Sequence, residues 1–275
     1  HFESASQKVY KYSDLRNIFS QYRQAWKLDR EVRVDDFIGF LKSAVDLDEV
    51  NLKFPSRAER RYIVGKTSHY ELALTLRKQS YFTHYTALFL HELTDQVPKI
   101  IYLNFEQPSK YRQDAELSQE NIDKAFQRPV RISKSRANYK DVTICILNGK
   151  YTGGKGVIEM KGPMGEQIRV TDMERTLIDI AVRPAYAGGI YEVLKAYEKA
   201  KDRVSINRLT AMLKSLAYIY PYHQAIGLYL EKAGYKESSI NLLRKFEMKY
   251  DFYLTYEMKE KSYSRKWRLY FPQGF

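Results

Sequence analysis

The sequence predicts an α+β fold, with an N-terminal module at residues 1–67 and a larger mixed α/β domain at residues 68–275 that ends in a helical bundle. Two helical stripes followed by two alternating apolar segments indicate the module. Strand-like runs alternate with helical segments through residues 69–170, and helical periodicity dominates from residue 171 onward. A chain of 275 residues that is 44% hydrophobic and 29% charged has the composition of a globular protein.

Two amphipathic helices and a ribbon make up the N-terminal module. Helices are expected at residues 13–27, with Ser13 as N-cap, and at residues 34–45. Alternation at residues 50–54, a Pro-Ser turn and a returning strand at residues 61–64 predict a two-stranded ribbon. Helix, helix and basic ribbon outline a winged helix-turn-helix. The outline lacks an evident third helix before the ribbon.

Strands and helices alternate through the first part of the larger domain. Apolar periodicity and runs of β-branched residues predict them. The expected helices are residues 69–78, 84–93 and 118–126, and the expected strands are residues 99–103, 142–147, 157–160 and 167–170. The last two strands flank a Gly-Pro turn and are expected to form a hairpin.

A helix is expected directly after the last of these strands. Thr171 and Glu174 have the spacing of a capping box. Opposite charges then recur four residues apart, from Arg175 to Asp179 and from Asp179 to Arg183. These are either ordinary surface ion pairs or a functional polar row, and the first interpretation is favoured. Further helices are expected at residues 190–201, 205–216, 221–233 and 238–248, with late strands within residues 250–271.

The net charge of +13 is concentrated in three clusters. The first is Lys53, Arg57, Arg60, Arg61 and Lys66. The second is Lys124, Arg128, Arg131, Lys134, Arg136 and Lys140. The third is Lys259, Lys261, Arg265, Lys266 and Arg268, interleaved with Tyr263, Trp267 and Tyr270. Each is either a phosphate-binding surface or a solvated face. The excess favours an anionic partner, nucleic acid first.

Residues suited to catalysis or metal binding are sparse. Cys145 is the single cysteine and lies in an apolar strand, which disfavours a nucleophile or a zinc site. His84 and His91 share a helical face but lack a clear third ligand. The glycine-rich residues 153–156 lack the Lys-Ser/Thr pair of a phosphate loop, so a hairpin loop is expected. We therefore expect no enzyme, no cofactor and no metal.

The cellular location is also an expectation from composition. One cysteine in 275 residues fits a reducing cytoplasm. The apolar runs are too short to cross a bilayer, and residues 1–4 show no apolar core of a secretory signal. A cytoplasmic protein with no membrane partner is expected.

Several blocks of the sequence resemble one known family. They are Ser-Tyr-Phe-Thr-His-Tyr-Thr-Ala-Leu at residues 80–88, Val-Thr-Asp-Met-Glu-Arg-Thr-Leu-Ile-Asp at residues 170–179, Arg-Pro at residues 183–184, Ala-Gly-Gly at residues 187–189, and Gly-Leu-Tyr-Leu-Glu-x-x-Gly at residues 227–234. In this order, and with the strand at residues 99–103 after the first block, they resemble the AbiEi-like antitoxins of type IV toxin–antitoxin systems, which act in abortive infection.

The resemblance implies a function and a set of residues. An N-terminal winged helix would bind operator DNA and repress its own operon, and a non-enzymatic C-terminal domain would counter a cognate nucleotidyltransferase-like toxin. The expected DNA-binding residues are Lys53, Arg57, Arg60, Arg61, Lys66, Arg128, Arg131, Lys134 and Arg136. The expected motif of the antitoxin domain is Glu174, Arg175, Asp179 and Arg183. Two alternatives remain open: an interaction module that neutralises a toxin without binding DNA, and a nucleic-acid-processing enzyme using Arg175 and Asp179.

Overall fold

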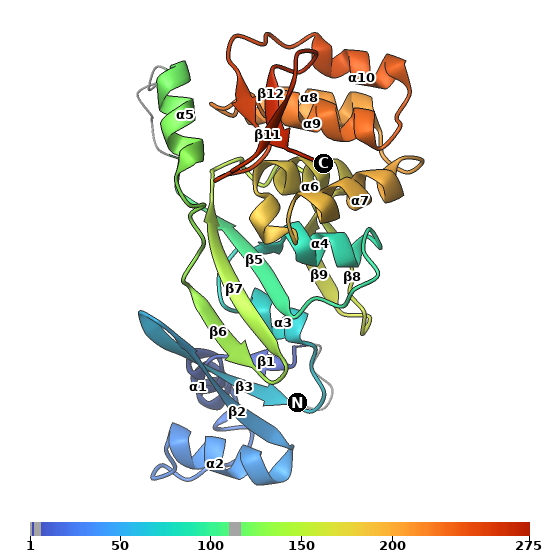
Figure 1. Ribbon diagram of the computed structural model, residues 1–275. Helices are drawn as coiled ribbons and strands as arrows, with labels where there is room; N and C mark the ends of the chain where they lie inside the picture. The colour runs from blue at the N-terminus through green and yellow to red at the C-terminus, as the bar shows by residue number, and fades with distance from the viewer. Residues whose placement is uncertain (1, 3–6, 110–116) are drawn as a thin grey trace.

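The computed structural model describes residues 2, 7–109 and 117–275. Within them the chain forms ten α-helices and three β-sheets, so the predicted α+β class is confirmed. Figure 1 shows a stack in which the N-terminal module lies at one end, a six-stranded sheet in the middle and the helical region at the other end. None of the described helices has the length and apolar character needed to span a membrane. The prediction of no secretory signal rests mostly on residues outside those described.

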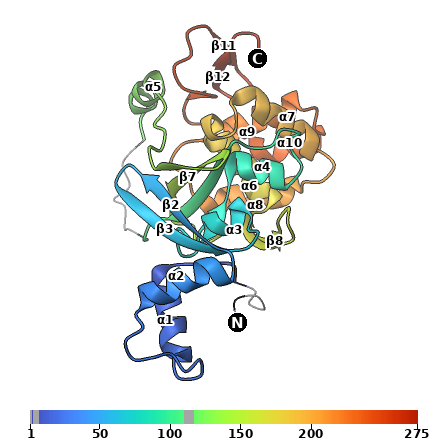
Figure 2. The same ribbon diagram turned by 90° about the horizontal axis from the view of Figure 1, so that it is seen from below.

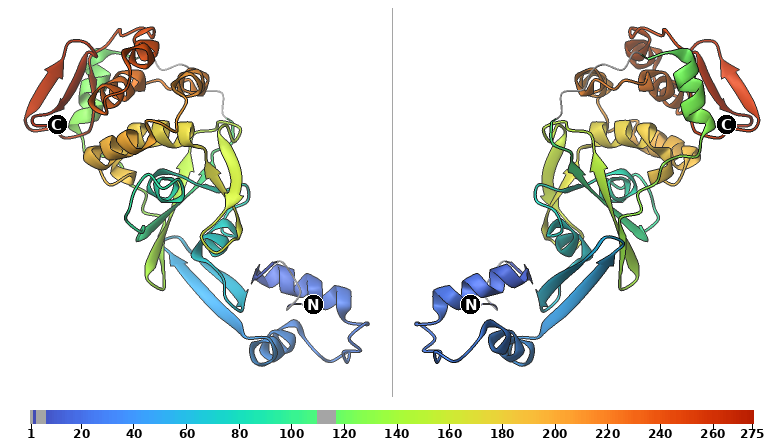
Figure 3. Two further views of the ribbon diagram at one scale, coloured as in Figure 1. Left: turned by 90° about the vertical axis from the view of Figure 1, so that its right-hand side faces the viewer. Right: turned by 90° about the vertical axis from the view of Figure 1, so that its left-hand side faces the viewer.

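The N-terminal module combines two helices with a three-stranded sheet. Its elements are β1 (Val9–Tyr10), α1 (Tyr12–Tyr22), α2 (Val34–Ala44), β2 (Leu47–Phe54) and β3 (Arg57–Val64). The strands follow the order β1-β3-β2, with β2 and β3 paired antiparallel as the predicted ribbon. Figures 2 and 3 show α1 and α2 at the far end of the ribbon from the body. The described part of the module contains no third helix.

The first helix begins and ends earlier than predicted. Its N-cap is Lys11, not Ser13, because Asp14 at the third helical position accepts a hydrogen bond from the Lys11 backbone N–H at 2.8 Å. The helix ends at Tyr22, five residues short of the predicted end. Trp26 beyond it stacks on the ring of Phe37 in α2 at 5.5 Å. The apolar spacing that suggested a longer helix therefore reflects packing of the following turn.

Each face of the ribbon is buried over part of its length. Leu47 and Tyr62 pack with α1 and α2 on one face. Leu52, Phe54 and Ile63 join the core of the central sheet on the other. Because the strand side chains alternate between the two faces, the ribbon contributes residues to both the core of the N-terminal module and the core of the central sheet.

The central sheet has six strands in the order β6-β7-β5-β4-β9-β8. Its strands are β4 (Tyr81–Phe82), β5 (Ile100–Glu106), β6 (Arg136–Tyr139), β7 (Val142–Gly149), β8 (Val157–Lys161) and β9 (Gln167–Thr171). Helix α3 (His69–Leu74) precedes them, and α4 (His84–Leu90) and α5 (Gln119–Gln127) lie between them in the chain. β5 and β7 are parallel, and β8 and β9 form the predicted hairpin. β7 and β8 lie in different halves of the sheet, so the loop that contains residues 153–156 is a crossover and the hairpin-loop prediction was wrong.

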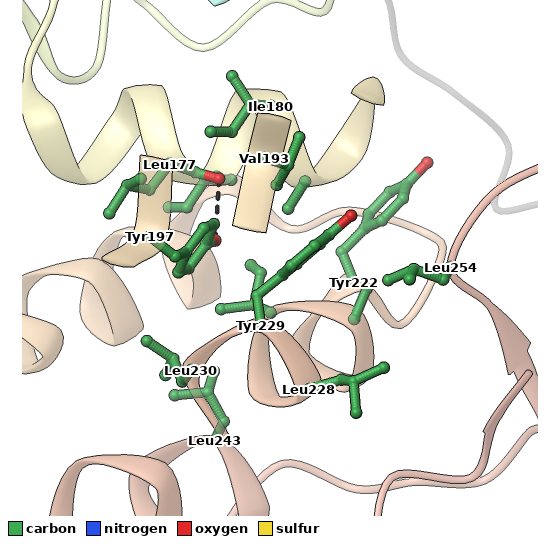
Figure 4. Packing of buried hydrophobic residues seen from close by; sticks show 14 of the residues in the cluster. Leu177, Ile180, Val193, Tyr197, Tyr222, Leu228, Tyr229, Leu230, Leu243 and Leu254 are labelled. Atoms are coloured by element: carbon green, nitrogen blue, oxygen red, sulfur yellow. Dashed lines mark hydrogen bonds between the residues drawn. The ribbon is translucent and has the colours of Figure 1, made fainter. Parts of the chain in front are cut away.

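The helical region follows β9. It contains α6 (Met173–Val182), a 3₁₀ turn (Pro184–Tyr186), α7 (Ile190–Ala200), α8 (Ile206–Leu216), α9 (Tyr222–Lys232), α10 (Glu237–Arg244) and a small sheet of β10 (Phe252–Tyr253), β11 (Lys261–Ser264) and β12 (Leu269–Pro272). Figure 4 shows how Leu177, Ile180, Tyr197 and Tyr229 pack in its core. The hydroxyl of Tyr197 donates to the carbonyl of Leu177 at 3.0 Å, which satisfies a buried polar group.

Candidate functional site

A pocket of about 570 Å³ lies where the central sheet meets the helical region. The carboxyl ends of the parallel strands β5 and β7 contribute Asn104 and Leu147–Lys150. The first turn of α4 and the inner face of α6 form further walls, with the connection between α8 and α9. Pockets at the carboxyl ends of parallel strands are a usual place for ligands, because strand ends and loops leave polar groups there.

The buried carboxylate of Asp179 organises the floor of this pocket. Its Oδ1 accepts a hydrogen bond from Arg175 Nε at 2.8 Å, and its Oδ2 accepts one from Thr83 Oγ1 at 3.0 Å. The Arg175 and Asp179 side chains are only 5% and 8% exposed. Burial opposes the charge of Arg175, but Asp179 raises the pKa of the guanidinium above its ordinary value, so Arg175 stays charged.

Arg175 also holds the glycine-rich crossover loop against α6. Its Nη1 donates to the carbonyl of Lys155 at 2.7 Å. The amides of this loop are already occupied, because the Glu106 carboxylate accepts hydrogen bonds from Thr152 N at 2.7 Å and from Gly153 N at 2.9 Å. Burial opposes the ionisation of Glu106, but these bonds lower its pKa. The loop therefore binds an internal carboxylate in the way that such amide nests bind anions.

The junction before α6 differs from the prediction by one residue. Asp172 is the N-cap, and its Oδ1 accepts from Arg175 N at 2.8 Å. Thr171 is the last residue of β9, so the predicted capping box was wrong. Glu174 instead accepts a hydrogen bond from Ser205 N at 3.1 Å and fixes the start of α8. Thr171 and Asp172 could both accept a hydrogen bond at the start of α6. The backbone direction decides which of them is the N-cap, and the sequence does not show that direction.

The polar row of α6 is not a surface feature. Arg175 and Asp179 form the predicted ion pair, but they are buried, which overturns the favoured interpretation of a helix surface. Arg183 lines the same pocket and forms no ion pair within the described chain, so the predicted pair of Asp179 with Arg183 was wrong. The predicted residues Arg175, Asp179 and Arg183 therefore come together in the pocket, and Glu174 does not line it.

His84 lies in the wall of the pocket. The residue is 8% exposed, its ring packs edge-on against Tyr186 at 5.3 Å, and its Nδ1 has no hydrogen-bond partner among the described residues. Its backbone has φ of +53°, a conformation that non-glycine residues seldom adopt. Burial lowers the pKa of His84 to about 4, so the ring is neutral near pH 7.

The positive charges around the pocket outnumber the negative ones. Arg131, Lys150, Arg175 and Arg183 line it, against Asp179 alone. Lys150 donates to the carbonyls of Leu216 and Ala217 at 2.6 and 2.7 Å, which fixes its ammonium beside the connection between α8 and α9. Four tyrosines also line the pocket: Tyr186, Tyr218, Tyr220 and Tyr222.

The first basic cluster is only partly available to a partner. Lys53, Arg57, Arg60 and Lys66 are exposed. Arg57 pairs with Glu59 at 2.7 Å, and Arg60 pairs with Glu49 at 3.1 Å. These exposed pairs are weak and leave the guanidinium groups at the surface.

Arg61 does not belong to the exposed set. It is 3% exposed, and its guanidinium donates to Thr75 Oγ1 at 2.9 Å and to the Thr75 carbonyl at 3.0 Å. Arg61 thus ties the ribbon to the segment after α3. Arg61 is therefore left out of the exposed set predicted to contact DNA, because the strand alternation that exposes Arg60 turns Arg61 inward.

The second and third clusters differ from each other. In the second, Arg128, Arg131 and Lys134 are exposed, whereas Arg136 is half-buried and donates to the Ser133 carbonyl at 3.1 Å. Two cations of the third cluster form ion pairs within the fold. There Lys266 pairs with Glu231 at 3.0 Å, Arg268 pairs with Asp251 at 2.9 Å, and Trp267 between them is fully buried.

The structure gives no support for a metal centre. Across residues 2, 7–109 and 117–275, no three His, Cys, Asp or Glu side chains lie close enough together to hold an ion. His84 and His91 occupy separate environments, because the ring of His91 contacts the Thr171 carbonyl at 2.6 Å. Cys145 is buried, and burial raises the pKa of its thiol, which disfavours the reactive thiolate.

Comparison with known proteins identifies the fold and no activity. No protein-family model matches the chain, and no curated protein matches it. The fold is similar to that of the crystal structure of the Rv2827c protein from Mycobacterium tuberculosis, with a TM-score of 0.61 and 15% sequence identity over 96% of this chain and 86% of that one. At this identity the likeness concerns architecture alone.

Several pocket residues were not predicted as site residues. They are Thr83, His84, Asn104, Lys150, Tyr186 and the aromatic stretch Tyr218–Tyr222. The sequence did contain signals for two of these groups. The block at residues 80–88 includes Thr83 and His84, and three tyrosines within five residues mark the connection between α8 and α9. Asn104 and Lys150 carry no such signal, since only the pairing of β5 with β7 brings them to the pocket.

Proposed function

We propose that the protein is a cytoplasmic antitoxin of a type IV toxin–antitoxin system, which binds operator DNA as an autorepressor and counteracts a nucleotidyltransferase-like toxin. The main support is that the two sequence blocks on which the family resemblance depends meet in space. Thr83 and His84 from residues 80–88 line the same pocket as Arg175 and Asp179 from residues 170–179. Blocks ninety residues apart that build one polar site are typical of a functional unit.

DNA binding is assigned to the exposed basic residues of the ribbon and of the second cluster. Lys53 and Arg57 stand at the ribbon tip, next to its turn. Phosphate contacts by Lys and Arg release counterions, so DNA affinity falls as salt rises, by about 0.9 in the logarithmic slope per phosphate neutralised.

An electrophoretic shift with the DNA upstream of the protein's own gene tests this assignment. The Lys53→Ala/Arg57→Ala variant is expected to reduce the salt slope by about 2 and to weaken binding at least tenfold. Lys259→Ala/Arg265→Ala is the matched control, because it removes two exposed basic residues far along the sequence from the ribbon. Absence of a shift by the wild type at low salt would overturn the DNA-binding part.

A module that neutralises the toxin without DNA binding is the second candidate. The ion pairs of Arg57 with Glu59 and of Arg60 with Glu49 favour it, because these acids weaken the field of the ribbon. Under this alternative the ribbon variant and the wild type neutralise the toxin equally well, and neither shifts DNA.

The proposal includes no catalytic step. Both oxygens of Asp179 are engaged, by Arg175 and by Thr83, so this carboxylate is poorly placed to act as a base. The proposed role of the pocket is therefore binding.

A further inference from the structure

The pocket on α6 has a surplus of positive charge that the protein itself does not neutralise. Its single carboxylate, Asp179, is already paired with Arg175. Arg131 and Arg183 also line the pocket and form no ion pair with any described residue. Cationic side chains that converge on a partly enclosed space favour an anion, and arginine pairs well with phosphate because its planar group offers two parallel donors.

Besides these cations, the pocket lining contains aromatic and apolar side chains. Tyr186, Tyr218, Tyr220 and Tyr222 line it, together with Ile132 and Ile219. The two isoleucines are 48% and 49% exposed, which is unusual for large apolar side chains. Aromatic and aliphatic side chains beside basic residues suit a planar ring such as a nucleobase, since stacking of a base on an aromatic side chain contributes about 1–3 kcal/mol.

The volume and position of the pocket also suit a small ligand. About 570 Å³ lies within the ordinary range of roughly 300–1,000 Å³ for small-molecule sites. Its walls come from β5, β7, α4, α6 and the connection between α8 and α9, so regular elements fix most of its shape. The buried network of Arg175, Asp179 and Thr83 holds the floor rigid before a ligand arrives.

We propose that this pocket binds a nucleotide, with its phosphates on Arg131 and Arg183 and its base against the tyrosines and isoleucines that also line the pocket. Arg175 acts as a positioning residue, since its donors already serve Asp179 and Lys155. The inference goes beyond the proposed antitoxin function and does not depend on it, because the nucleotide test is made on the pocket alone. Arg131 belongs both to the pocket and to the second basic cluster.

Isothermal titration of the full chain with ATP, GTP, CTP and UTP tests the proposal. At least one of the four is expected to bind with a one-to-one stoichiometry. Adenosine and tripolyphosphate, the probes for the two halves of the ligand, are expected to bind at least tenfold more weakly. Arg131→Gln and Arg183→Gln are each expected to weaken nucleotide binding at least tenfold, with an unchanged unfolding temperature as the check of folding.

The control is Lys259→Gln/Arg265→Gln, which removes two exposed charges remote from the pocket lining. Unchanged nucleotide affinity in this control supports a specific site. The proposal is overturned if none of the four nucleotides binds at millimolar concentration, or if the control loses affinity as much as the pocket variants. It is also overturned if tripolyphosphate binds as tightly as the best nucleotide, because the base would then contribute nothing.

Discussion

Arg175 is the residue on which the site depends most. It forms an ion pair with Asp179, holds the crossover loop through the Lys155 carbonyl, and lies against Gly156, where an added Cβ would stand 2.8 Å from the Arg175 Cβ. Arg175 can be buried because its guanidinium donates hydrogen bonds to the Asp179 carboxylate and to the Lys155 carbonyl, which offset the loss of water contacts. Its role is to join helix, loop and sheet into one rigid floor.

Removing the partner of Arg175 should be costly. Asp179→Ala leaves a buried, unpaired guanidinium, and we expect the free energy of unfolding to fall by about 3–5 kcal/mol. Lys124→Ala is the matched control, because Lys124 and Glu120 form an exposed pair at the same i,i+4 spacing. A change of no more than about 0.5 kcal/mol is expected there. Urea denaturation measures both, and an equal effect of the two substitutions would contradict the assigned role.

His84 should make the stability depend on pH. Its pKa is about 4 in the folded chain and 6.5 when the ring is exposed, so the unfolded chain takes up the proton first. The free energy of unfolding should therefore fall as the pH drops through this interval, by about 2 kcal/mol between about pH 7 and pH 5 from this residue. His223 acts in the same direction, because burial also lowers its pKa to about 4.

Denaturation at the two pH values isolates the contribution of His84. The His84→Asn variant should show a smaller loss of stability between pH 7 and pH 5 than the wild type, whatever its absolute stability. An identical pH dependence in variant and wild type would show that His84 does not titrate differently on folding.

At the scale of elements, helix packing depends on glycine at one position. Gly227 in α9 faces Trp267, and an added Cβ would stand 2.1 Å from the Trp267 ring. The indole Nε1 also donates to Glu231 at 2.7 Å, one turn further along the helix. Trp267 connects β11 and β12, so this contact fixes the small C-terminal sheet on α9.

Gly227→Ala should therefore destabilise the protein although alanine favours helices. Overpacking is expected to lower the free energy of unfolding by about 1–3 kcal/mol. Gly39→Ala in the exposed part of α2 is the control, because nothing lies within 4 Å of an added Cβ. That substitution should be neutral or stabilise by up to about 1 kcal/mol. Equal thermal unfolding midpoints for the two variants would rule out the proposed packing constraint.

Most elements were predictable from local pattern, and the exceptions have a common cause. The periodicity of residues 173–182 and 206–216 and the glycine after α9 located three helices within a few residues. β4 and β6 were missed because they are two and four residues long. Their conformation depends on pairing with β5 and β7, and short segments carry too little periodicity to reveal that.

The candidate site was only partly predictable for a related reason. Arg175 and Asp179 were singled out by their i,i+4 spacing, but burial reversed the favoured interpretation of them. Arg131 was predicted as a DNA contact, and it also lines the pocket, because the chain turns beside the ends of β5 and β7 before β6. The sequence shows which positions carry a cation, but the order of the strands determines which other residues lie next to that cation in the fold.

At the scale of the whole molecule, the charge of +13 has three different uses. In the third cluster, Lys266 and Arg268 pair with Glu231 and Asp251 around the buried Trp267, whereas Lys259, Lys261 and Arg265 stay exposed. The ribbon keeps exposed cations at Lys53 and Lys66, and the second cluster contributes exposed cations near the pocket at Arg128 and Arg131. The free positive charge thus lies on both the module and the body, which fits two separate anionic partners.

Growth of cells that co-express this chain with a nucleotidyltransferase-like toxin encoded beside its gene tests the central claim most directly. We expect the wild type to restore growth that the toxin arrests, and Asp179→Ala, which disrupts the pocket floor, to restore it poorly. Toxin levels should be equal in all strains, as measured by immunoblotting. Growth that stays arrested with abundant, folded wild-type protein would contradict the assignment as an antitoxin.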